Sequence, residues 1–151
     1  MYNPNYKPEP KEFEETVVQI NRISKKTKGG NQIHFTALVV TGDKKSKVGV
    51  ALGKAKSVAD AIQKAVAKAR KNMFEVNIVD GTITDTINQK FKGAQIVIRP
   101  GKKGSGLIAG GPVRAVVELC GIKDIVSKIN GSKTKSLNVW ATVAALTKLK
   151  K

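Results

Sequence analysis

The sequence has few cysteine, histidine, aromatic and acidic residues, and each scarcity excludes a class of protein. One cysteine, Cys120, cannot form an internal disulfide, which suits a reducing cytoplasm. A zinc site needs about four ligands, and His34 and Cys120 are too few to supply them. Four Phe, two Tyr and one Trp do not predict a base-stacking platform. No apolar run approaches the ~18 residues of a membrane span, and we expect no signal peptide and no membrane partner.

The charge of the chain is its most unusual property. The 151 residues include 28 Lys and Arg but only 11 Asp and Glu, which gives a net charge of +17. Self-repulsion at such a charge opposes a compact state, so a polyanionic partner is the simplest explanation. Apolar residues make up 40% of the chain, enough for a folded core. The scattered acidic residues, the single cysteine and the single histidine predict no enzyme, no metal and no cofactor.

The first half is predicted to form three strands and a helix after a mobile tail. Residues 1–14 hold three of the five prolines and little apolar content. The middle strand has apolar groups on both faces, which predicts a central place in a sheet. The predicted segments are strands over 16–24, 32–42 and 48–54, basic loops over 25–31 and 43–47, and a helix over 57–73.

The predicted helix over 57–73 has a clear start signal, because Ser57 precedes Asp60 by three residues. One side carries an apolar stripe of Val58, Ile62, Ala65, Val66, Ala69 and Met73. The opposite side carries Lys64, Lys68 and Lys71. Those lysines form either a solvated helix face or a nucleic-acid contact, and the two basic loops favour the contact.

The second half is predicted to mix strands and helices. Asp80-Gly81 is a turn candidate, and Gly121 is expected to end a helix. Cys120 continues the apolar row of Val113, Val116 and Val117, so a core position is predicted for it. The predicted segments are one or two strands over 75–91, a strand over 94–100, a helix over 112–120, a strand over 123–129, a basic loop over 130–136 and a helix over 137–151.

The segment "GSGLIAGGPVR" matches a dinucleotide-binding fingerprint through Gly104, Gly106 and Ala109. That fingerprint requires the helix to begin within the motif. Proline is tolerated at the first helical position, so we expect the helix to begin at Pro112, a turn or more beyond the glycines. The segment then predicts a docking loop for phosphate or an acidic protein surface. Arg114 contacts such a partner or pairs with Glu118 one turn on.

Several longer blocks occur in order: "INRISKKTKGG", "FTALVVTGD", "VGVALGKAKSVADAIQKAVAKARKNM", "DGTI" and "GSGLIAGGPVRAVVELCGI". Through them the chain resembles the family of the fifth small-subunit ribosomal protein of bacteria, over about residues 15–149. The resemblance implies an α+β protein in which a domain similar to the double-stranded-RNA-binding module precedes a small mixed α/β domain. We expect boundaries of 1–14, 15–74 and 75–151.

The resemblance also implies a structural role in the small ribosomal subunit, in the cytoplasm. The implied partners are small-subunit ribosomal RNA, the fourth and eighth small-subunit proteins, and messenger RNA along the path by which it enters. Gly106 and Arg114, with Gly104 beside them, match the interface with the fourth protein, which influences decoding accuracy. A free-standing binder of double-stranded RNA and an enzyme that uses the glycine loop are the alternatives.

The residues expected to contact RNA form two sets. The family's RNA-contacting loop matches Lys25, Lys26, Lys28, Gly29 and Gly30. The remaining basic turns and the helix face add Lys44, Lys45, Lys47, Lys54, Lys56, Lys64, Lys68 and Lys71. Asn31 replaces a frequent Arg of the family and Ala51 a usual Gly, which weakens the expected contacts at these two positions.

Overall fold

A computed structural model describes residues 12–149, which form two four-stranded sheets and three helices. The expected α+β class is confirmed, while most of the predicted tail lies outside the described residues. The first sheet has the order β1-β2-β3-β4 and the second the order β5-β6-β8-β7. The elements are β1 (Glu14–Thr27), β2 (Gly30–Gly42), β3 (Lys47–Ala55), α1 (Val58–Lys71), β4 (Phe74–Glu75), β5 (Ile87–Phe91), β6 (Ala94–Pro100), β7 (Leu107–Ile108), α2 (Gly111–Cys120), β8 (Ile125–Gly131) and α3 (Lys135–Lys148).

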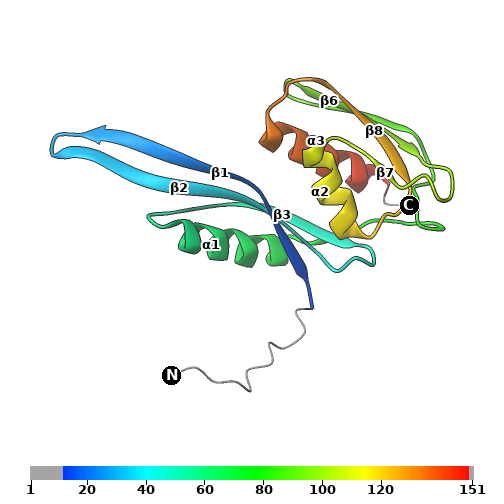
Figure 1. Cartoon of the computed structure of the whole chain (residues 1–151), viewed down its shortest axis with the longest axis horizontal. Coiled ribbons are helices and arrows are strands. Elements are labelled where there is room, and N and C mark those ends of the chain that lie inside the picture. Colours follow the sequence, from blue (N-terminus) through cyan, green and yellow to red (C-terminus); the bar gives the residue numbers. More distant parts are fainter. Residues whose placement is uncertain (1–11, 150–151) are drawn as a thin grey trace.

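Strands β1 and β2 form a hairpin that extends well beyond the rest of the first sheet (Figure 1). Strand β3 pairs with β2 only as far as Phe35, so residues 30–34 pair with β1 alone. The predicted loop over 25–31 is therefore wrong: Lys25 and Lys26 belong to β1, and the chain reverses at Lys28 and Gly29. Backbone pairing continues through these polar residues because the ladder needs no apolar side chains.

Helix α1 lies close against one face of the first sheet. Its predicted cap is confirmed, since the Ser57 hydroxyl accepts a hydrogen bond from the Asp60 N–H at 3.1 Å. The face that it buries consists of Ala61, Ala65 and Ala69. A Cβ on Gly53 of β3 would overlap the carbonyl oxygen of Ala61, so only glycine allows this approach. The helix ends at Lys71, two residues short of the predicted end.

The opposite face of the first sheet packs against the second half of the chain. One apolar core joins Leu38, Val40 and Val48 of the first sheet to residues of α2, α3 and the second sheet. Helix α2 lies between the two sheets (Figure 1). The predicted buried row is confirmed, because Val113, Val116, Val117 and Cys120 are each fully buried.

Helices α2 and α3 cover one face of the second sheet and leave the other face open (Figure 1). The predicted Asp80-Gly81 turn is confirmed by two hydrogen bonds of 3.0 Å between the backbones of Val79 and Thr82. Gly121 ends α2 in a left-handed conformation, as predicted. The basic loop predicted over 130–136 is too long, because β8 continues to Gly131 and α3 begins at Lys135.

Candidate nucleic-acid interface

A groove between β3 and α1 gathers four of the predicted RNA-contacting lysines. Its volume is about 510 Å³. Strand β4 pairs with β3 only at Lys47 and Val48. Among residues 12–149 the rest of β3 has no strand on this side, so the groove runs along a free sheet edge. The groove is lined by Leu52, Gly53, Lys54, Lys64, Ala67, Lys68 and Lys71. All four lysines are exposed, and no acidic residue lines the groove. We call this feature the lysine groove.

The other flank of α1 differs in charge. Arg70 donates a hydrogen bond to the Glu15 carboxylate of β1 at 2.7 Å, and its guanidinium lies 6.0 Å from the centre of the Phe13 ring. This flank presents Ile62 and Val66, which pack against the sheet. The unbalanced positive charge of α1 therefore lies on the side of the lysine groove.

The hairpin tip carries a second group of predicted residues. Lys25, Lys26 and Lys28 are exposed there. A Cβ on Gly29 or Gly30 would meet no atom within 4 Å, so the backbone of the tip is open to close approach. Arg22, which the sequence prediction missed, lies exposed on the same face of β1 as Lys26, four residues along the strand. The period of two in a strand is the signal that identifies it.

The turn between β2 and β3, together with the first residue of β3, carries the third group: Lys44, Lys45 and Lys47, all exposed. Asp43 organises the turn by accepting hydrogen bonds from the N–H groups of Lys45 and Lys47, at 2.8 and 2.9 Å, and of Ser46. Partial burial opposes the charged form, but these backbone donors outweigh it and lower the pKa of Asp43.

Lys44 has contacts within the chain that the other two lysines of this turn lack. Its ammonium lies 2.7 Å from the Glu14 carboxylate, and its N–H donates to the Leu119 carbonyl at 3.0 Å. Part of its charge is therefore balanced internally. Lys45 and Lys47 make no ion pair among residues 12–149.

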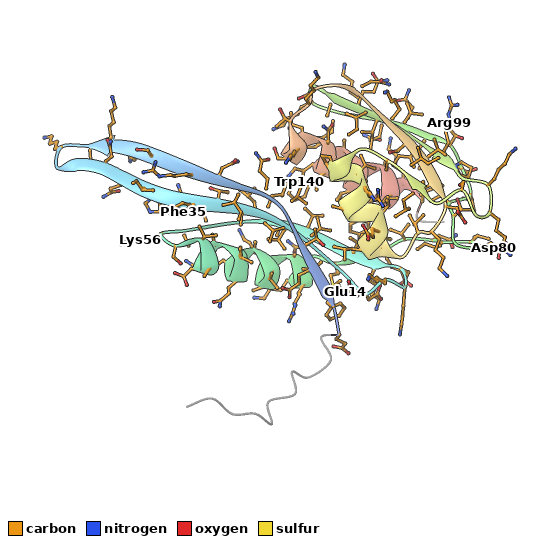
Figure 2. All side chains as sticks on the ribbon, viewed as in Figure 1. Glu14, Phe35, Lys56, Asp80, Arg99 and Trp140 are labelled. Atoms are coloured by element: carbon orange, nitrogen blue, oxygen red, sulfur yellow. The ribbon has the colours of Figure 1, made fainter. Side chains whose placement is uncertain are left out.

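The hairpin tip and the β2–β3 turn lie at opposite ends of β2. That strand has 13 residues, so at about 3.3 Å per residue the two groups are about 40 Å apart. The lysine groove lies between them, with Lys56 near the start of α1 (Figure 2). A partner that contacts all three groups must be extended, as an RNA helix is.

The glycine segment is shaped chiefly by contacts within the chain. Gly104 and Gly106 have φ of +87° and +71°, in the left-handed region that favours glycine. The Gly106 N–H donates to the Asp124 carboxylate at 2.8 Å. A Cβ at either glycine would meet no atom within 4 Å, so their outer sides are open.

Strand β7 and the cap residue Gly110 separate the glycines from Arg114, which is exposed on the first turn of α2. Arg114 and Glu118 form no ion pair among the described residues. The helix begins at Gly111, one residue before the predicted start and beyond the fingerprint. The glycines therefore do not place a dinucleotide at its N-terminus.

Cys120 is fully buried. Burial, together with the negative charge of Asp43, raises the pKa of its thiol to about 12. Over residues 12–149 there is no group of three potential metal ligands. No helix in that range has the length and hydrophobicity required to cross a membrane.

Comparison with known proteins assigns the chain to a family. The protein-family model described as "Ribosomal protein S5, N-terminal domain" matches residues 13–77. The family model described as "Ribosomal protein S5, C-terminal domain" matches residues 89–151. The "Small ribosomal subunit protein uS5" of Campylobacter jejuni strain 81-176 is 49% identical over 139 residues, which cover 92% of this chain and 95% of that protein. The protein of the same name from strain RM1221 gives the same values. The chain therefore belongs to the S5 family of ribosomal proteins, whose members are structural, non-enzymatic constituents of the small subunit.

Proposed function

We propose that this protein binds small-subunit ribosomal RNA through the basic surface of its first half. The surface comprises the hairpin tip, the lysine groove and the β2–β3 turn. The observation that carries the proposal is the lysine groove, where four exposed lysines line one cavity without an acidic residue. Such a cluster is unfavourable in isolation and becomes favourable when phosphates neutralise it.

The chemistry of the surface favours reading of the RNA backbone over reading of bases. Lysine binds phosphate as a point charge and carries no planar fork for a base edge. The aromatic side chains that stack on unpaired bases are absent from the lining of the groove. An RNA helix with a defined shape is the partner that this arrangement fits.

The domain boundaries, the protein neighbours and the position relative to messenger RNA belong to the same proposal. Residues 15–74 form the RNA-binding part and residues 75–151 the second part, with the core between β2, β3 and α2 holding them together. Gly104, Gly106 and Arg114 contact the fourth small-subunit protein, and the eighth is a further neighbour. The protein lies along the path by which messenger RNA enters and supports decoding accuracy. The contact with the fourth protein is supported by the open outer sides of both glycines and by the exposed Arg114, which forms no ion pair within residues 12–149.

Sedimentation through a sucrose gradient tests the proposal against a free-standing binder of double-stranded RNA. Tagged protein expressed in cells should sediment with small subunits and stay there when excess unrelated double-stranded RNA is added to the lysate. The Lys64→Gln, Lys68→Gln, Lys71→Gln variant should shift toward the top of the gradient. Release by unrelated RNA, or full retention of the triple variant, would contradict the proposal.

A further inference from the structure

The outer face of the second sheet carries a separate concentration of positive charge. Strands β5, β6, β7 and β8, all within the described residues, contain no Asp or Glu. Their three cationic residues are Lys90, Arg99 and Lys128, and all three are exposed. Figure 2 shows Arg99 on the side of the sheet away from α2 and α3.

The strand register places all three cations on this one face. Arg99 is opposite Val126, Lys128 is opposite Val97, and Lys90 is opposite Gln95. Residues at the alternate positions of β6 and β8, such as Ile96, Ile98 and Ile125, are fully buried on the other face. Because side chains alternate between the faces of a strand, the cations share the open side.

The same face offers amide groups and a shallow apolar floor. A hollow of about 290 Å³ is lined by Val97, Arg99, Val126, Ser127, Lys128 and Asn130. Next to it, the Gln95 amide donates to the Asn88 side-chain oxygen at 3.1 Å. That bond leaves the Gln95 oxygen and the Asn88 NH₂ group available as acceptor and donor. The face therefore carries cations, amides and two valines side by side.

An open face of an antiparallel sheet is ordinarily polar, so polarity alone identifies no partner. A solvated surface, however, ordinarily intersperses charges of both signs, whereas this face has one sign only. This single sign of charge favours an anionic partner over any other. None of the residues that line the hollow is aromatic, so it offers no platform for stacking of bases.

We propose that the outer face of the second sheet is a second RNA-binding surface, which contacts phosphates and ribose 2′-hydroxyls of an RNA helix. Lys90, Arg99 and Lys128 neutralise phosphates. The amides of Asn88, Gln95 and Asn130 suit the 2′-hydroxyl, which is both donor and acceptor. This inference rests on the proposed function only in taking ribosomal RNA as the polyanion. The lysine groove is lined solely by residues of β3 and α1, so the two surfaces have no residue in common.

The charge component is tested by the Arg99→Gln, Lys128→Gln variant, with affinity for small-subunit ribosomal RNA measured from low to high KCl. A plot of log affinity against log salt concentration has a negative slope, and each lost phosphate contact makes it shallower by about 0.7 to 0.9. Loss of both contacts should therefore reduce the magnitude of the slope by about 1.4 to 1.8. The control is Lys135→Gln, Lys148→Gln, which removes the same charge from exposed positions of α3. The control should retain the wild-type slope.

The 2′-hydroxyl component is tested by Asn130→Ala with an RNA duplex and a DNA duplex of one sequence. Loss of one hydrogen bond should lower affinity for RNA about fivefold and leave affinity for DNA unchanged. Equal effects on both duplexes would overturn the 2′-hydroxyl contact.

Two further results decide between partners and between surfaces. Should Arg99→Gln, Lys128→Gln leave the salt slope intact and instead weaken binding to another small-subunit protein, the face binds protein and the inference is wrong. The Lys64→Gln, Lys68→Gln, Lys71→Gln variant is measured in parallel. If only the groove variant reduces the salt dependence of RNA binding, this inference fails and the proposed function stands. If only the Arg99→Gln, Lys128→Gln variant reduces it, RNA binds the second sheet and the proposed role of the groove fails.

Discussion

The guanidinium of Arg70 lies 2.7 Å from the Glu15 carboxylate, on the flank of α1 that faces away from the lysine groove. This pair balances the cation on one side of the helix, while Lys64, Lys68 and Lys71 on the other side form no ion pair with any described residue. An exposed pair of this kind contributes little stability, about 0 to 1 kcal/mol. Its consequence is an asymmetric helix that presents positive charge in one direction.

The close approach of α1 to β3 should depend on Gly53. A Gly53→Ala substitution would force a Cβ against the backbone of Ala61 and should destabilise the protein by roughly 1 to 3 kcal/mol. Urea unfolding followed by circular dichroism measures the change. Gly29→Ala is the control, because a Cβ there meets no atom within 4 Å and should alter stability by about 0.5 kcal/mol or less. Similar stability of both variants would show that α1 can move away at no cost.

The hairpin tip should contribute to RNA binding and not to stability. The combined Lys25→Ala, Lys26→Ala, Lys28→Ala variant should bind small-subunit ribosomal RNA more weakly, since three exposed cations are lost. Its unfolding free energy should change by no more than about 0.5 kcal/mol per site. Filter binding and urea unfolding give the two values. Reduced stability with unchanged RNA affinity of the folded protein would make the tip a structural element only.

The proposed contact with the fourth small-subunit protein is best tested by Gly106→Asn. Asparagine tolerates the left-handed conformation at φ +71° better than other residues with a side chain, while it adds bulk on the open side. The variant should remain folded, bind the fourth protein more weakly and alter misreading in translation. Arg114→Gln should do the same, whereas Glu118→Gln on the same helix is the matched control. Wild-type affinity and accuracy in both test variants would leave the segment without a docking role.

The β2–β3 turn should lose stability in acid through Asp43. The folded state lowers the pKa of this carboxyl, so its contribution is present above the unfolded pKa and is lost as pH falls through the folded value. At pH 7, Asp43→Asn should therefore be less stable than wild type, and the difference should shrink below about pH 4. Urea midpoints at pH 7 and pH 3 measure it. A difference independent of pH would show that the charge of Asp43 has no role.

Local signals in the sequence were sufficient for several elements. Ser57 and Asp60 identified the start of α1, Asp80-Gly81 identified a turn, and Gly121 identified the end of α2. Each signal acts within a few residues, through side-chain caps or backbone conformations that few residues adopt. The apolar row that ends at Cys120 also predicted burial, because helical period alone determines it.

Features that depend on distant partners could not be predicted in this way. The hairpin continues through Lys25 and Lys26 because β2 pairs with them, and no local pattern signals that pairing. The lysine groove exists because Gly53 admits a helix face of alanines from another part of the chain. The common face of Arg99 and Lys128 follows from the register of β6 and β8, which the sequence alone did not specify.

The central claim is that the lysine groove contacts RNA phosphates, and the salt dependence of binding tests it most directly. Affinity for small-subunit ribosomal RNA is measured against KCl concentration for wild type and for Lys64→Gln, Lys68→Gln, Lys71→Gln. The control is Lys123→Gln, Lys135→Gln, Lys148→Gln, which removes three exposed cations elsewhere. Three lost contacts should reduce the magnitude of the negative log–log slope by about two to three. The control should retain the wild-type slope. Identical slopes for all three proteins would contradict the claim.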